Sequence, residues 1–427
     1  MVVKELKESC TALLIGGILL LFLWGVMMTS APPTPEESEN IEDVRVSGMP
    51  QLLIQESGSL GGLNNLIFNQ EEERYVPVKD HLISYVLYGS GIRARRSDAV
   101  GGTLAIPSAL APIGEHVFAM IPSYHTLLKL DRDLSVRTQE NFGPFTYAGS
   151  FTRFMRAHNN HLFFFYDDPN EGTILFAYDR DLNRVGSLSI PLHPSGGYAY
   201  NLNQFLIVEN TLYVIAGADA FPAVRCASEA RMSEEELEFE IVSGCSNAHT
   251  IVFGAIDIHD PKHMRIEMFK QVTDESIPES FMARIDSKRK QTLMVEIGSS
   301  GESIFTLRSP ESMTKLLSKE SRNVRILALT QENPFYALVE KQGGVFLLPI
   351  SLEGETLTFG EMLNLNLSTR DILGTPLMKR FSSMLFIVLQ DQLRVAQVVD
   401  TPELVLTQNL SNLSGEPSYV SDFFFWD

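Results

Sequence analysis

A recurring pair of strand-like segments constrains the fold of this 427-residue chain more than any other feature. Six times, a strand-like segment and a tight polar turn precede a second segment rich in β-branched and aromatic residues. The second segments begin near His116, His161, Thr211, Thr292, Pro334 and Met384. Successive starts lie 45, 50, 81, 42 and 50 residues apart. Such a period indicates a repeat architecture, in which each unit buries its apolar faces against its neighbours.

A polar turn inside the unit repeats as well. Residues 131–134 and 179–182 both read Asp-Arg-Asp-Leu and follow apolar segments, so the tetrapeptide recurs 48 residues later. Aspartate at the start of a turn can accept hydrogen bonds from amides two residues ahead. The later units keep a polar turn at this position with different residues.

We predict an all-β fold, a six- to seven-bladed β-propeller, because a four-stranded blade takes about 40 to 50 residues. Six blades are visible between about residues 109 and 407. Segments 75–105 and 416–427 could pair to build or close a further blade, which would remove exposed sheet edges. A pair of β-sandwiches or an irregular β-solenoid is the alternative, and the even spacing favours the propeller.

An insertion around residues 218–249 accounts for the one long interval. It contains Cys226 and Cys245, which we expect to form a disulfide in an oxidising compartment, with two free thiols as the alternative. The acidic segment 233–241 between them suits either a half-exposed strand or a helix cap. Rigid β scaffolds usually carry recognition on such loops. We predict a binding surface formed by Cys226, Glu234, Glu235, Glu236, Phe239, Cys245, Tyr124 and His125.

An uncharged run at residues 11–28 precedes all of this and predicts a transmembrane helix. At about 1.5 Å per residue it spans about 27 Å, enough for a thin bilayer core. Lys4 and Lys7 precede the run, and the next basic residue is Arg45, so we expect the N-in/C-out orientation. Pro32 disfavours signal cleavage nearby, and a cleaved signal is the alternative.

A stalk is expected after the anchor. Residues 29–44 contain three prolines, five acidic residues and no basic residue, a composition typical of an extended linker. The predicted organisation is a cytoplasmic tail at 1–10, the anchor at 11–28, a stalk or linker at 29–74 and the propeller at 75–427.

The net charge and the absence of known catalytic motifs narrow the classes of function that the sequence allows. The formal net charge of −19 argues against nucleic acid as a partner. Phosphate-binding, nucleophile-elbow and zinc-protease motifs are missing from the sequence, so we predict no catalytic residues, no metal and no cofactor. The pairs His158/His161 and His259/His263 suit turns better than metal sites. Three sequons, at Asn366, Asn409 and Asn412, would be glycosylated only in a secretory pathway.

These features favour a membrane-anchored scaffold or assembly factor that binds other membrane or envelope proteins. A bacterial inner membrane with a periplasmic propeller is favoured over a eukaryotic secretory-pathway membrane, because so large a domain carries a single candidate disulfide. The competing hypothesis is a hydrolase or lyase that acts on glycan or peptide in the central funnel, since propeller active sites leave no local motif.

Overall fold

The computed structural model describes residues 49–57, 62–78, 83–88, 91–96, 103–105, 107–143, 154–168, 172–190, 198–220, 231–232, 237–238, 249–274, 281–286, 288, 291–298, 301–309, 315–372, 376–398, 402–410 and 419–426. The predicted tail, anchor and first part of the stalk, residues 1–48, lie outside these ranges. In the part of the chain that the structure describes, no helix is long and apolar enough to cross a membrane.

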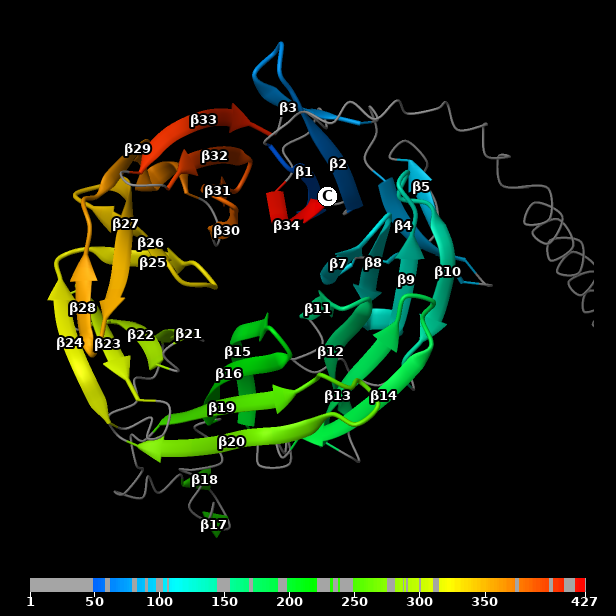
Figure 1. Ribbon diagram of the computed structural model, residues 1–427, viewed down its shortest axis with the longest axis horizontal. Helices are drawn as coiled ribbons and strands as arrows, with labels where there is room; N and C mark the ends of the chain where they lie inside the picture. Colours follow the sequence, from blue (N-terminus) through cyan, green and yellow to red (C-terminus); the bar gives the residue numbers. More distant parts are fainter. Residues whose placement is uncertain are drawn as a thin grey trace, which may run out of the picture. The chain divides into compact units, whose positions relative to one another are not determined.

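Seven sheets surround a common axis, which makes the domain a seven-bladed β-propeller (Figure 1). We call the strands of a blade a to d, from the axis outward. Blade 1 contains β34 (Tyr419–Trp426), β1 (Gln51–Ser57), β2 (Gly62–Asn69) and β3 (Arg74–Pro77). Blade 2 contains β7 (Ala109–Ile113), β8 (His116–Ile121), β9 (Thr126–Leu130) and β10 (Val136–Asn141). Blade 3 contains β11 (Met155–His158), β12 (His161–Asp168), β13 (Gly172–Asp179) and β14 (Arg184–Ile190).

The remaining four blades follow the same order along the chain. Blade 4 contains β15 (Tyr198–Val208), β16 (Thr211–Ala220), β19 (His249–Asp257) and β20 (Arg265–Asp274). Blade 5 contains β21 (Phe281–Asp286), β22 (Gln291–Ile297), β23 (Ser303–Arg308) and β24 (Leu316–Arg322). Blade 6 contains β25 (Arg325–Leu329), β26 (Phe335–Lys341), β27 (Gly344–Glu353) and β28 (Thr356–Phe359), and β29 (Leu363–Ser368) also pairs with β27. Blade 7 contains β30 (Leu377–Phe381), β31 (Met384–Leu389), β32 (Gln392–Gln397) and β33 (Glu403–Asn409).

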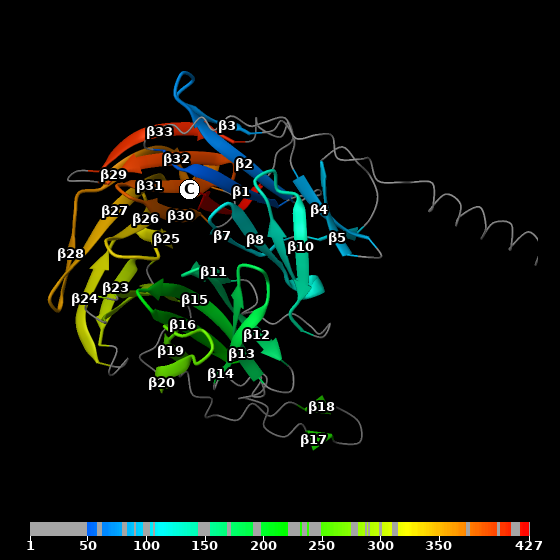
Figure 2. The ribbon, with the colours of Figure 1, turned by 45° about the vertical axis from the view of Figure 1, so that its right-hand side comes forward.

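Smaller elements complete the description. β4 (Ile83–Tyr88), β5 (Gly91–Arg96) and β6 (Thr103–Leu104) extend the sheet of blade 1 towards blade 2. Short 3-10 helices occupy η1 (Pro122–Tyr124) and η3 (Thr369–Asp371). β17 (Arg231–Met232) and β18 (Leu237–Glu238) form a separate two-stranded sheet. The turned view in Figure 2 shows this small hairpin away from the blades.

The ring closes through β34 and β1, and this corrects two expectations. β34 pairs antiparallel with β1, from Gln51↔Trp426 to Ser57↔Tyr419. The C-terminal strand therefore pairs with residues 51–57, whereas the sequence suggested a partner in 75–105. Residues 51–78 belong to blade 1, so the propeller begins well before residue 75 and the linker expected at 29–74 is too long.

Seven apolar clusters hold the ring together, one at each interface between neighbouring blades. In β12, Phe164 faces blade 2, and its neighbours Phe163 and Phe165 face blade 4. Because both faces of each sheet are covered, the second strands are apolar at consecutive positions instead of alternating. This explains the continuous apolar runs on which the repeat was recognised. The b strands that follow blade 1 all begin within one residue of the predicted positions.

Phe164→Ala should destabilise the propeller by about 3–5 kcal/mol, because its side chain is 0% exposed and contacts the rings of Phe142, Phe176 and Tyr178. Denaturant unfolding of the full chain would measure this. Ile297→Ala is the matched control: that side chain is 55% exposed, and a change within about 0.5 kcal/mol is expected. Equal effects of the two substitutions would contradict the described packing.

Candidate functional site

Blade 4 departs from the other blades in strand length and in one connection. Its strands contain 11, 10, 9 and 10 residues. The connection between its b and c strands runs over residues 221–248 and includes the β17–β18 hairpin, in which Arg231 pairs with Glu238. Of the two alternatives for segment 233–241, a short strand is therefore present at Leu237–Glu238. The b–c connections and the links between blades lie on one face, which we call the loop face; the a–b and c–d turns lie on the turn face.

Most of the predicted binding residues lie outside the described residues: Cys226, Glu234, Glu235, Glu236, Phe239 and Cys245. The expected disulfide is among them. Tyr124 and His125 are described, in the b–c connection of blade 2. His125 adopts the left-handed conformation and is only 1% exposed. Its ring stacks on Phe142 at 5.6 Å between centroids and meets the edge of Tyr166, so it packs between blades 2 and 3.

Basic side chains occupy one equivalent position on the a strands of blades 3, 5 and 7. Arg156, Arg284 and Lys379 each stand two residues before the last pair of the a–b hairpin. Because the register is shared, the three side chains leave their strands at the same height along the axis. Three of the seven blades thus carry a cation at one register position, and no local motif in the sequence predicts this.

Arg284 is fully engaged in joining blades 5 and 6. It is 7% exposed and donates hydrogen bonds to three carbonyl oxygens, those of Ala283 at 2.7 Å, Thr330 at 3.1 Å and Leu329 at 3.3 Å. Burial lowers the pKa of Arg284 to about 10. Gln204 extends the joint to blade 4, because it accepts from the Ile285 amide at 2.7 Å and donates to the Gln331 carbonyl at 2.6 Å.

Lys379 joins blade 7 to blade 1. Its Nζ lies 2.7 Å from Oδ1 of Asp422, donates to the carbonyl oxygen of Phe423 and sits 3.8 Å from the ring centroid of Phe424. The side chains of Lys379 and Asp422 are 25% and 29% exposed, so solvent reaches the pair. Burial lowers the pKa of Lys379, and the carboxylate of Asp422 opposes that change.

Arg156 is the least engaged of the three. In the part of the chain that the structure describes, its single hydrogen bond runs from Nη1 to the adjacent Met155 carbonyl at 3.0 Å. Its guanidinium also lies 5.9 Å from the ring centroid of Phe205. Burial lowers its pKa, and the negative charges of Asp422 and Glu332 oppose this effect. We call Arg156, Lys379, Asp422 and Glu332 the axial cluster.

The axial cluster draws on four blades, which is why sequence reasoning missed it. Arg156 comes from blade 3, Glu332 from the a–b connection of blade 6, Lys379 from blade 7 and Asp422 from blade 1. Among the described residues, no group of three or more His, Cys, Asp or Glu side chains could hold a metal ion. The axial cluster contains the guanidinium of Arg156, the ammonium of Lys379 in an ion pair, and the carboxylates of Asp422 and Glu332.

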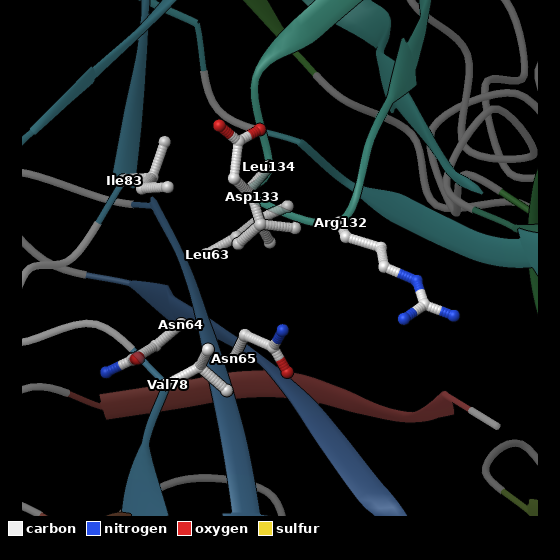
Figure 3. Close-up of a pocket in the computed structure, with 8 residues that line it drawn as sticks. All are labelled: Leu63, Asn64, Asn65, Val78, Ile83, Arg132, Asp133 and Leu134. Carbon is white, nitrogen blue, oxygen red and sulfur yellow. The ribbon is translucent and has the colours of Figure 1, made fainter. Parts of the chain in front are cut away.

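A shallow hollow lies elsewhere, where blade 1 meets the c–d turn of blade 2. It is lined by Leu63, Asn64, Asn65, Val78, Ile83, Arg132, Asp133 and Leu134 (Figure 3). Arg132 points away from the other lining side chains. The turn that lines it is the first of the two repeated tetrapeptides. In both copies the leucine side chain is buried. The leucine backbone adopts the left-handed conformation, with φ 63° at Leu134 and φ 65° at Leu182.

The first aspartates of the two identical tetrapeptides have pKa values that are shifted in opposite directions. The pKa of Asp131 is raised to about 6, first by burial and then by the carboxyl of Asp133, although Arg137 lowers it. At Asp179 burial also acts upward, but hydrogen bonds from the side chain and amide of Asn183 outweigh it, and its pKa falls. The groups around each turn, and not the tetrapeptide that the two turns share, therefore set the direction of the pKa shift.

The contribution of Asp131 to the free energy of unfolding should therefore fall as pH rises from about 4 to about 6, because folded Asp131 retains a proton that an unfolded aspartate has lost. Asp133→Asn removes the neighbouring charge and should flatten this part of the profile, each pKa unit corresponding to about 1.4 kcal/mol. Urea unfolding across pH 4–7 measures the effect. Asp181→Asn, the equivalent change in blade 3, should leave the profile unchanged, and flattening by both variants would refute the assignment.

Comparisons with known proteins find similarity in architecture. No protein-family model matches the sequence, and no curated protein matches it. A candidate 6-phosphogluconolactonase from Bacteroides fragilis superposes with a TM-score of 0.47 at 11% identity, over 93% of this chain and 100% of that one. A second candidate 6-phosphogluconolactonase, from Bacteroides uniformis, gives a TM-score of 0.46 at 13% identity, over 88% and 99%. AztD from Citrobacter koseri gives 0.45 at 10% identity, over 87% and 96%.

Proposed function

We propose that this chain is a single-pass membrane-anchored, extracytoplasmic β-propeller that binds other membrane or envelope proteins as a scaffold or assembly factor. The proposal rests on the structure of blade 4. Its strands are long, and its b–c connection spans residues 221–248, whereas the corresponding connection of blade 6 contains only Gln342 and Gly343. A propeller core gains no stability from such an excursion, so a role in recognition accounts for it best.

Polar residues near the axis of the propeller support this proposal in part. Arg284, Gln204 and Lys379 bind backbone groups of neighbouring blades, so these polar groups stabilise the ring. The competing hypothesis, a hydrolase or lyase for glycan or peptide, would use the open groups of the axial cluster. The two hypotheses separate experimentally because they place function on different residues.

Deleting residues 226–245 and joining the ends with a short Gly-Ser turn should reduce partner capture at least tenfold. Capture is measured by crosslinking and affinity purification from solubilised membranes. The melting transition should change little, because no strand of a blade is removed and longer surface loops add little entropy cost. The matched control is His259→Ala combined with Lys262→Ala, two exposed residues in the c–d turn of the same blade on the turn face. A folded deletion variant that captures the same partners in the same amounts would place recognition elsewhere.

The orientation is tested independently. Alkaline phosphatase fused after Asp427 through a flexible linker should be active in a bacterial host, since the basic residues before the apolar run favour a translocated C-terminal domain. A reporter that works only in the cytoplasm should be inactive at the same position. The reverse pattern would show that the propeller is cytoplasmic.

A further inference from the structure

We propose that β20 pairs with β20 of a second copy of this chain, in an antiparallel arrangement whose two-fold axis passes through Val272. The pairing joins the two blade 4 sheets into one continuous sheet. It concerns the outer wall of blade 4 and does not depend on what the insertion in this blade binds. The length of β20, its register and its charges support it.

β20 is the outer strand of blade 4, and among the described residues it pairs with β19 alone. It contains 10 residues, whereas the outer strands of blades 2, 3, 5 and 7 contain 6, 7, 7 and 7. Figure 1 shows it on the rim of the ring. The outer edge of such a strand presents N–H and C=O groups that can hydrogen-bond to a strand from another molecule.

A bulge limits the part of this edge that can accept a strand. The register with β19 shifts between Ile266 and Met268, which leaves Glu267 as an extra residue in β20. A bulge bends the strand and disrupts regular pairing. From Met268 to Asp274 the pairing with β19 is continuous, so the backbone of this segment is regular. A second strand can follow it there.

The charges of this segment are complementary to those of the same segment read in reverse. Residues 270–274 read Lys-Gln-Val-Thr-Asp. With the two-fold axis at Val272, Lys270 of one copy lies opposite Asp274 of the other, and the same pair recurs on the far side of the axis. Opposite charges at directly opposed positions stabilise an antiparallel pair, and like charges destabilise it. An axis at Lys270 would oppose two ammonium groups, so the charges favour the axis at Val272.

Apolar surface is available at the same edge. Met268 and Val272 pack against the cluster between blades 4 and 5, yet both side chains are only partly buried. Val272 is β-branched and meets its own copy at the axis, a pair that suits antiparallel sheets. Because each copy uses the same surface, a two-fold contact closes on itself and yields a dimer instead of a fibre.

Sedimentation velocity of the full chain in detergent, over a range of protein concentrations, tests the proposal. The wild-type chain should dimerise reversibly. Lys270→Asp and Asp274→Lys should each raise the dimer dissociation constant at least about fivefold, because each opposes two like charges, and the double variant should recover the wild-type constant within about twofold. A wild-type chain that stays monomeric would overturn the proposal and leave this edge for a strand of a different protein. Association that the variants do not change, such as contact between membrane anchors, would overturn it as well.

Cysteine crosslinking locates the axis. Directly opposed residues of an antiparallel pair have Cα atoms about 4.5 to 5.5 Å apart, which is within the range that a disulfide spans. Val272→Cys should therefore give a disulfide-linked dimer under mild oxidation, in clear excess over the unsubstituted chain and over Val405→Cys. Val405 is the matched control, a valine that is 44% exposed on the outer strand β33 of blade 7. Equal yields from the two cysteine variants would contradict the pairing, even if a charge variant fails to fold.

Discussion

The pairing of β34 with β1 is the constraint on which the rest of the propeller depends. Seven residue pairs join segments that lie more than 360 residues apart in the chain. Closing a loop of that length costs about 5 kcal/mol in chain entropy by the logarithmic scaling. The clusters on both sides of blade 1 repay this, because they contain Phe423, Phe424 and Trp426 from the closing strand. Lys379 strengthens the same junction by holding Asp422 and the Phe423 carbonyl. Without β34, two of the seven interfaces would lose their innermost side chains.

A single register position serves two purposes in this ring. At Arg284 the cation is buried and saturated by carbonyl oxygens, which ties neighbouring blades together. At Arg156 the same backbone position carries a partly buried guanidinium, whose one hydrogen bond among the described residues goes to the adjacent Met155 carbonyl. The repeated tetrapeptide shows a similar division, since Asp131 and Asp179 occupy equivalent turns and shift their pKa values in opposite directions. In this propeller, the blade repeats the backbone, and the groups around each repeated position decide the chemistry.

This distinction explains how far sequence reasoning could reach. The b strands were located to within one residue because apolar runs such as that at His161–Asp168 are local and covered on both faces. A further blade was expected, but its strands β1 and β2 were missed because they carry Gln55, Asn64 and Asn65, which are polar yet buried, and because the partner of β1 comes from the far end of the chain. The insertion was predicted at residues 218–249 because it interrupts a regular spacing, and the connection between β16 and β19 runs over residues 221–248. The axial cluster could not be found this way: its members are single residues from four blades, and only the closed ring brings them together. The burial of His125 was equally hidden, because it depends on Phe142 and Tyr166.

The location of the closing strand also sets the order of events during biosynthesis. Every other strand described here precedes β34 in the chain, so blade 1 lacks its innermost strand until the ribosome has made Trp426. Until then, β1 presents an unpaired edge that can hydrogen-bond to strands of other molecules. That edge of β1 therefore stays unpaired while the other six blades are made, and it is covered only when residues 419–426 have been added.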